Sequence, residues 1–156
     1  MKGHMQTFGT LLNNIENVID GTVSTGEALQ TICHLLKDSI SHYDWVGFYL
    51  VDPEKERELV LGPYVGEPTE HVRIPFGLGI CGQAAERKET FMVQDVSKEK
   101  NYLSCSIEVK SEIVIPILKN DEVVGELDID SHSVSPFTYE DRNFLEQVCE
   151  MISEII

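Results

Sequence analysis

Two strand-like runs joined by a tight polar turn constrain the fold of this chain more than any other feature. Residues 112–118 and 122–130 are rich in aliphatic and β-branched side chains, and Lys119, Asn120 and Asp121 separate them. A connection this short and polar favours a β-hairpin. The C-terminal half therefore contains a pair of neighbouring antiparallel strands, and the rest of the chain has to cover their apolar faces.

Further strands precede the hairpin. Residues 45–51 are aromatic and β-branched and end in an Asp-Pro turn, and residues 58–62 are predicted to return antiparallel to them. Short extended stretches within residues 63–75 and at residues 90–93 bring the total to about six strands. The pattern consists of hairpins rather than strand–helix–strand units, which favours an antiparallel sheet.

Three amphipathic segments predict helices that pack on this sheet. Apolar residues recur every three or four positions over residues 8–21, and Ser24 with Glu27 has the pattern of a capping box that opens a second helix. A closing helix begins after Thr138, again in capping-box style. With 156 residues, 42% of them hydrophobic, the chain is expected to form one α+β domain over residues 1–156, a central antiparallel sheet with helices packed against it.

The charge and the cysteines limit the partners. A formal net charge of −15 disfavours binding to nucleic acid and to anionic membranes, which depends on clustered Lys and Arg. The apolar runs are too short to cross a bilayer and no signal-peptide pattern opens the chain, so a cytoplasmic location is expected. The four cysteines are far apart and lack zinc-site spacing, so free thiols, no metal and no cofactor are expected.

Two of the four cysteines are candidates for chemistry. Cys33 and Cys149 lie on predicted apolar helix faces, whereas Cys105 follows a polar segment and is expected in a loop. Cys81 lies among glycines ahead of a short helix predicted at residues 83–87, where a helix N-terminus would stabilise a thiolate. The residues alone also allow structural interpretations: a loop thiol without function, and a small residue at a tight strand-to-helix junction.

Acidic and aromatic pairs are predicted to share strand faces. Asp128 and Asp130 are two residues apart and Glu112 lies on the neighbouring strand, so mutual repulsion would raise a carboxyl pKa and keep a protonated acid near neutral pH. The same carboxylates would suit an α-ammonium group; a solvated acidic strand edge is the alternative. Trp45 and Tyr49 share one side of their strand, either as an aromatic wall for a thioether or as core.

Four segments resemble the free methionine-(R)-sulfoxide reductases, a family built on a GAF domain. They are residues 44–49 (DWVGFY), 72–82 (VRIPFGLGICG), 111–116 (SEIVIP) and 125–131 (GELDIDS). The resemblance implies a single GAF-like catalytic domain that reduces free L-methionine (R)-S-oxide to methionine with a cysteine thiolate. It also implies thioredoxin or a similar dithiol as the reductant, and pairing into a homodimer.

By this resemblance the nucleophile maps to Cys105, and Cys81 maps to a second family cysteine. A sulfenic acid formed on Cys105 would condense with Cys81 to a disulfide. His71 occupies a position at which members often carry a third cysteine, and strand alternation predicts it to be a surface residue. The resemblance assigns substrate binding to five residues: Trp45, Tyr49, Glu112, Asp128 and Asp130.

Two other functions fit the same residues. A GAF-type sensor would bind a small ligand and signal without turnover. A thiol redox sensor would form the bridge between Cys81 and Cys105 in response to an oxidant. A turnover assay distinguishes both from a reductase, because only a reductase releases a product from the sulfoxide.

Overall fold

The predicted hairpin forms the core of the sheet. It consists of β5 (Ser111–Lys119) and β6 (Glu122–Ser131). Asn120 and Asp121 join the two strands with φ angles of 54° and 63°, the left-handed conformation that a two-residue type I′ turn needs at both positions. Asn and Asp adopt this conformation more readily than other L-residues, which explains why the turn forms without glycine. The computed structural model describes residues 2–21, 24–103 and 106–156.

A single six-stranded sheet is built around this hairpin. The strand order is β3-β2-β1-β6-β5-β4, and every neighbouring pair is antiparallel, which confirms the predicted antiparallel sheet. β1 and β6 lie at the centre, so side chains on both of their faces are covered by other parts of the chain. The remaining strands are β1 (Trp45–Asp52), β2 (Lys55–Val65), β3 (Arg73–Pro75) and β4 (Phe91–Val93).

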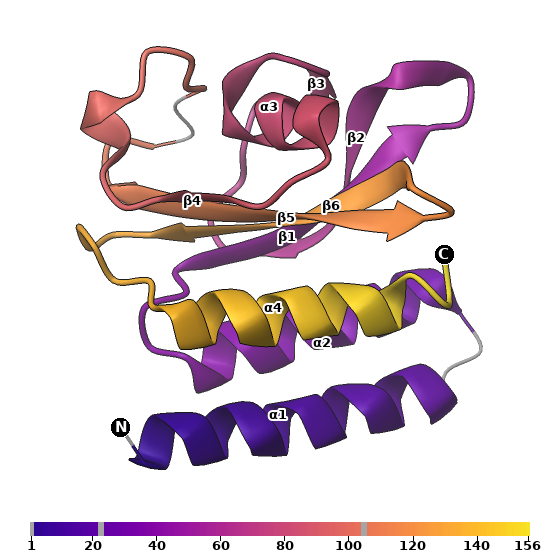
Figure 1. Cartoon of the computed structure of the whole chain (residues 1–156), viewed down its shortest axis with the longest axis vertical. Helices are drawn as coiled ribbons and strands as arrows, with labels where there is room; N and C mark the ends of the chain where they lie inside the picture. Colours follow the sequence, from indigo (N-terminus) through magenta and orange to yellow (C-terminus); the bar gives the residue numbers. More distant parts are fainter. Residues whose placement is uncertain (1, 22–23, 104–105) are drawn as a thin grey trace.

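Helices cover both faces of the sheet. They are α1 (Lys2–Gly21), α2 (Thr25–Ser39), α3 (Gly79–Arg87) and α4 (Tyr139–Ile152), with a 3₁₀ turn at Val96–Lys98. α2 and α4 lie beneath the sheet, and α1 packs against α2 and α4 as an outer layer (Figure 1). The short α3 lies on the opposite face, together with the loops (Figure 1). The α+β architecture expected from the sequence is confirmed.

Two helices begin earlier than predicted. The backbone of α1 is helical from Lys2, ahead of the periodic segment that starts at Phe8. α3 begins at Gly79 rather than at Gln83, because Gly79 has a φ of 68° that lets the chain turn sharply into the helix. Cys81 therefore lies in the first turn of α3 and not ahead of it.

Both predicted helix starts carry a side-chain cap, but only the one at Thr138 is a complete capping box. Ser24 Oγ accepts a hydrogen bond of 3.3 Å from the Glu27 amide. At α4 the cap is reciprocal: Thr138 Oγ1 accepts from the Asp141 amide at 3.1 Å, and Asp141 Oδ2 accepts from the Thr138 amide at 2.8 Å. These bonds satisfy N–H groups that a helix start otherwise leaves unpaired.

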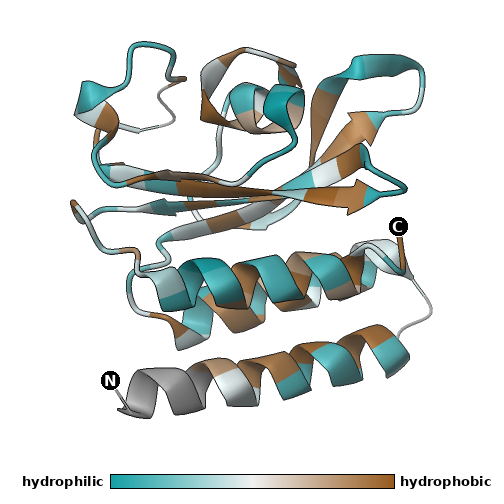
Figure 2. Cartoon of the chain, in the orientation of Figure 1, coloured by the Kyte–Doolittle hydropathy of each residue, from teal (hydrophilic) through white to brown (hydrophobic). Residues whose placement is uncertain are grey.

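The larger apolar core lies between the sheet and the helices α2 and α4. Hydrophobic residues run along the strands and along the helix surfaces that face them (Figure 2). Alternation sends every second residue of β5 and β6 into this core, where the thiols of α2 and α4 are also buried, as predicted. Its members include Ile113, Ile115, Leu127, Ile129, Cys33 and Cys149.

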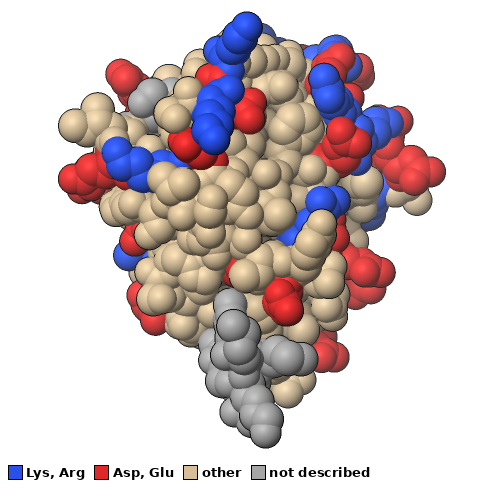
Figure 3. Space-filling view, turned by 60° about the vertical axis from the view of Figure 1, so that its left-hand side comes forward, with Lys and Arg blue, Asp and Glu red and all other residues tan. Residues whose placement is uncertain are grey.

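Two further features concern the helices and the charged surface. None of the described helices is both long enough and apolar enough to span a membrane. On the face drawn in Figure 3, Lys and Arg side chains lie beside Asp and Glu side chains, so their charges are locally balanced.

Candidate active site

Three acidic residues of β6 point to the sheet face that carries α3. Asp130 pairs across the sheet with Trp45 of β1 and Glu112 of β5. Asp128 and Glu126 follow at two-residue intervals on the same face. Asp128 and Asp130 are only 2% and 3% exposed, so a solvated acidic strand edge is the wrong interpretation. The strands instead bury a row of carboxyl groups, which is costly unless a ligand or protons neutralise them.

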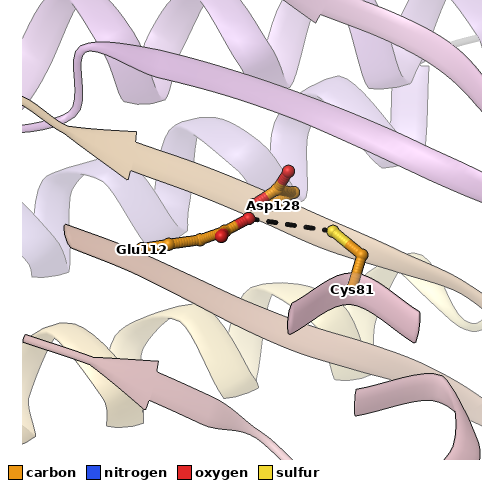
Figure 4. A group of neighbouring side chains, drawn as sticks. All are labelled: Cys81, Glu112 and Asp128. Carbon is orange, nitrogen blue, oxygen red and sulfur yellow. Dashed lines mark hydrogen bonds between the residues drawn. The ribbon is translucent and has the colours of Figure 1, made fainter. Parts of the chain in front are cut away.

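α3 places a thiol directly over this row. Cys81 is 5% exposed, and its Sγ donates a hydrogen bond of 3.8 Å to Glu112 Oε2 (Figure 4). The Cys81 sulfur and one carboxylate oxygen each of Glu112 and Asp128 all lie within 4.8 Å of one another. Three separate elements thus bring one thiol and two carboxyl groups together.

The start of α3 is held by a residue that the sequence analysis did not single out. Asn101 Oδ1 accepts a hydrogen bond of 2.8 Å from the Gly79 amide, and Asn101 Nδ2 donates one of 2.8 Å to the Gly77 carbonyl. Gln83 Nε2 donates to the Asn101 carbonyl at 3.0 Å. The segment that leads toward Cys105 is therefore fastened to the helix that carries Cys81.

The two predicted aromatic residues border the acidic row and also hold a loop. Trp45 Nε1 donates to the Glu67 carbonyl at 2.9 Å, and Tyr49 Oη donates to the His71 carbonyl at 2.8 Å. The indole of Trp45 lies over Gly47, where a Cβ atom would be 2.3 Å from Trp45 Cη2. Glycine at position 47 is thus required for the indole to lie flat beside the carboxyl groups.

The structure corrects the interpretation of His71. This residue precedes β3 instead of belonging to it, and it is half-buried rather than on the surface. It lines a small cavity together with Tyr49, Cys81, Glu112 and Asp128. His71 is therefore one of the residues that line the candidate site. Strand alternation alone did not predict this position.

Cys105 lies outside the described residues, but the chain on either side of it borders the site. Leu103 lines the small cavity beside Cys81. Ser106 lines a second small cavity, with Trp45 and Asp130. A larger hollow, of about 390 Å³, lies elsewhere, between α4 and β5, and is lined by none of the predicted site residues.

Burial dominates the electrostatics of the cluster. It raises the pKa of Asp130 well above its usual range, and the neighbouring Asp128 raises that pKa further. Burial also raises the pKa of Asp128, against hydrogen bonding to Glu112 and Cys81, which lowers it. The pKa of the Cys81 thiol is raised by burial first and by the surrounding carboxylates second. Burial therefore favours the protonated forms of these acids and the thiol form of Cys81.

Glu126 is a fourth buried acid, and sequence reasoning missed it. It is 0% exposed, and among the described residues neither of its carboxylate oxygens has a hydrogen-bond partner; Asp128 Oδ1 is in the same situation. Burial and the nearby Asp128 raise the pKa of Glu126 well above its usual range. The sequence did contain a signal for a third acid on this strand face, because Glu126 precedes Asp128 by the same two-residue interval that separates Asp128 from Asp130.

Replacing Glu126 with Leu is expected to raise the free energy of unfolding by about 1–3 kcal/mol, because it removes a buried carboxyl without partners and retains most of the volume. Urea-induced unfolding measures the change. Glu122→Leu, on the exposed end of the same strand, is the matched control and should change stability by less than about 0.5 kcal/mol. A loss of stability in Glu126→Leu would contradict the interpretation.

The fold and the site together define the class of this protein. A family model described as the GAF domain matches residues 24–156, which include the whole sheet, α2, α3 and α4. The free methionine-R-sulfoxide reductase of Saccharomyces cerevisiae is 38% identical over 149 residues, which cover 92% of this chain and 82% of that protein. The Escherichia coli protein of the same name is 32% identical over 149 residues, which cover 96% of this chain and 88% of that protein.

A solved structure agrees with these relatives. The X-ray structure of free methionine-R-sulfoxide reductase from Neisseria meningitidis in complex with its substrate superposes with a TM-score of 0.89 at 34% identity, covering 94% of this chain and 86% of that one. The chain belongs to the GAF domain family and, within it, to the free methionine-R-sulfoxide reductases.

Proposed function

We propose that this chain, as one catalytic domain, reduces free L-methionine (R)-S-oxide to methionine. The observation that carries the proposal is the buried row of carboxyl groups beside an aromatic pair and a thiol, in a chain whose relatives bear the name of that activity. A free amino acid has an α-ammonium group, and the row offers it several carboxylates. A peptide-bound methionine lacks that group, which explains a preference for the free substrate.

Residues of three strands, β1, β5 and β6, bind the substrate. Glu112, Asp128 and Asp130 bind the α-ammonium group, and its positive charge compensates the repulsion among buried acids. Trp45 and Tyr49 contact the methyl and thioether part, because sulfur packs favourably against aromatic rings. Both aromatic residues are already fixed by hydrogen bonds to the loop that covers them, so little conformational freedom is lost on binding.

The reaction transfers one oxygen atom and two electrons. The Cys105 thiolate attacks the sulfoxide sulfur while a protonated acid, Glu112 or Asp130, donates a proton to the sulfoxide oxygen. The oxygen then passes from the substrate sulfur to the Cys105 sulfur: the substrate sulfur–oxygen bond and the sulfur–sulfur bond formed in the attack both break, methionine leaves in its reduced form, and Cys105 holds the oxygen and the proton as a sulfenic acid. Raised carboxyl pKa values in the cluster supply the proton donor at neutral pH.

Cys81 completes the cycle as the resolving thiol. Its sulfur attacks the Cys105 sulfenic acid, which gives a disulfide and one molecule of water. Because burial and carboxylates oppose the Cys81 thiolate, its proton has to leave during the attack, and Glu112 at 3.8 Å is placed to accept it. An external dithiol, which we propose to be thioredoxin in the cytoplasm, then reduces the disulfide.

The test of the function is methionine release from each sulfoxide epimer, assayed with an excess of dithiol reductant. We expect product from the free R epimer and little from the S epimer. Without reductant, the intact mass should fall by about two hydrogens, as disulfide formation requires. Binding of the R epimer without methionine release would instead favour a sensor, and an unchanged mass after one turnover would exclude Cys81 as the resolving thiol.

Asn101→Ala is expected to slow disulfide formation by about tenfold, because the segment next to Cys105 loses its attachment to the start of α3. Stability should fall by about 1–2 kcal/mol through the lost hydrogen bonds. Mass spectrometry at timed intervals after a single turnover measures the rate. Asn13→Ala, on the exposed face of α1, should leave it unchanged. A wild-type rate in Asn101→Ala would show that this attachment does not position the thiols.

A further inference from the structure

The acidic row contains more carboxyl groups than one substrate ammonium can balance. Glu112, Glu126, Asp128 and Asp130 are all at most 6% exposed, and Cys81 lies over them at 5% exposure. Glu126 lies toward the inner end of the row, opposite Tyr49 in the strand register and beyond the residues assigned to the substrate. A buried cluster of like charges has a strong tendency to take up protons or a cation.

The ligand geometry suits a thiophilic cation. The Cys81 sulfur, an oxygen of Glu112 and an oxygen of Asp128 all lie within 4.8 Å of one another, and the sulfur is 3.8 Å from Glu112 Oε2 (Figure 4). Bonds to zinc of about 2.0–2.3 Å bring ligand atoms to roughly 3.5 Å from each other. Side-chain adjustments on the order of 1 Å would therefore let a single ion contact all three residues.

A second, independent observation concerns the unpartnered oxygens beside this group. Both oxygens of Glu126 and Oδ1 of Asp128 are buried, and none has a hydrogen-bond partner among the described residues. Glu126 lies two residues from Asp128 on the same strand face, and its charge acts on Cys81. Buried acceptors without donors favour the binding of a ligand, and Glu126, the next carboxyl group along the same strand face, is a candidate for a further oxygen ligand.

We infer that Cys81, Glu112, Asp128 and Glu126 form a binding site for a thiophilic divalent cation, with Zn²⁺ as the ion that this ligand set fits best. One thiolate and carboxylate oxygens in a tetrahedral arrangement favour Zn²⁺ over Mg²⁺ or Ca²⁺, which take six or more oxygen ligands. Binding displaces the proton of the Cys81 thiol and any proton held by the ligating carboxyl groups, all of which pass to solvent, while no group is oxidised or reduced. Spacing rules did not indicate this site, because its residues come from α3, β5 and β6.

The site has a consequence for turnover, which rests on the proposed function. An ion bound to Glu112 and Asp128 occupies two of the carboxylates assigned to the substrate ammonium, and it removes Cys81 from the resolving step. Zn²⁺ therefore acts as an inhibitor that competes with methionine sulfoxide. A chelator should restore full activity, because no covalent change accompanies binding.

The test uses the reduced full chain, titrated with Zn²⁺ by calorimetry in buffers of different ionisation enthalpy and with Cd²⁺ by ultraviolet absorption. We expect at least one proton released per ion bound, from Cys81, and a thiolate-to-Cd²⁺ charge-transfer band. Cys81→Ser should abolish the band, and Glu126→Gln, which keeps the shape, should weaken Zn²⁺ binding by at least about tenfold. Cys105→Ser is the matched control and should retain both signals, and thermal unfolding checks that each variant is folded.

Several results would overturn the inference: no saturable Zn²⁺ binding by the reduced wild type, an unchanged Cd²⁺ band in Cys81→Ser, or loss of the band in Cys105→Ser instead. The inference and the proposed function fail separately. Methionine release is assayed with a chelator present, so a chain that binds Zn²⁺ at Cys81 and releases no methionine keeps the site and loses the function. A chain that releases methionine and does not bind Zn²⁺ keeps the function and loses the site.

Discussion

Cys105→Ser is expected to abolish methionine release, with a loss on the order of 10³-fold or more in kcat/KM. A serine hydroxyl is a far weaker nucleophile than a thiolate at neutral pH, and it cannot hold the transferred oxygen as a sulfenic acid. The measurement is methionine formed from the R epimer over time, with an excess of dithiol. Substrate binding should persist, because the carboxyl groups and aromatic residues are unchanged, and a thermal shift on adding the sulfoxide measures it.

The control for this variant is Cys149→Ser, which replaces a thiol on the helical side of the sheet. Cys149 is 3% exposed and its sulfur lies 3.9 Å from the Ile115 carbonyl, in the core between α4 and β5. The Cys149→Ser variant should release methionine at close to the wild-type rate. Full activity in Cys105→Ser would exclude Cys105 from the mechanism and would leave Cys81, the described thiol that contacts the acidic row, as the candidate nucleophile.

Asp141→Ala is expected to lower the free energy of unfolding by about 3 kcal/mol, a large share of the stability of a domain this size. Asp141 is completely buried and accepts hydrogen bonds from Tyr43 Oη at 2.6 Å, from the Thr138 amide at 2.8 Å and from Thr138 Oγ1 at 2.9 Å. Its loss removes the side-chain half of the α4 capping box and leaves the Tyr43 hydroxyl buried without its carboxylate partner. Urea-induced unfolding at neutral pH measures the effect.

The pH dependence of stability provides a second measurement on Asp141. Burial alone would raise the pKa of this carboxyl, but hydrogen bonds with His42, Tyr43 and the Thr138 backbone outweigh it and lower the pKa. A folded-state pKa below the unfolded value of about 3.9 gives stability that is complete above that pH and is lost as the pH falls further. Asp141→Ala should therefore lose less stability than wild type below about pH 4. Glu140→Ala, the exposed neighbour, should follow the wild-type curve, and parallel curves for all three would contradict this account.

Local patterns predicted the strand faces correctly because alternation is a property of the backbone itself. Asp128 and Asp130 share a face with Glu112 opposite, as their spacing requires. The hairpin turn and the caps at Ser24 and Thr138 were predictable for the same reason, since each depends on residues within four positions. The resemblance to a known family contributed the direction of the chemistry, which no spacing contains.

The remaining features depend on contacts between distant segments. Whether the acidic row is buried depends on α3 lying over it, and the position of α3 is set by Gly79 and by Asn101, which is 22 residues away in sequence. His71 became part of the site because the Tyr49 hydroxyl donates a hydrogen bond to its carbonyl, a contact between β1 and the loop ahead of β3. Such contacts have no local signal in a single sequence, so the cavity beside Cys81 could not be predicted.

The strict separation of the two sheet faces has a practical meaning for protein engineering. Even-numbered residues 112, 126, 128 and 130 of β5 and β6 face the site, whereas odd-numbered residues 113, 115, 127 and 129 belong to the helical core. A combinatorial library that varies only the even positions would sample new substrates while the apolar packing that supplies most of the stability stays intact. Selection for altered sulfoxide specificity can therefore proceed on this scaffold with few variants lost to misfolding.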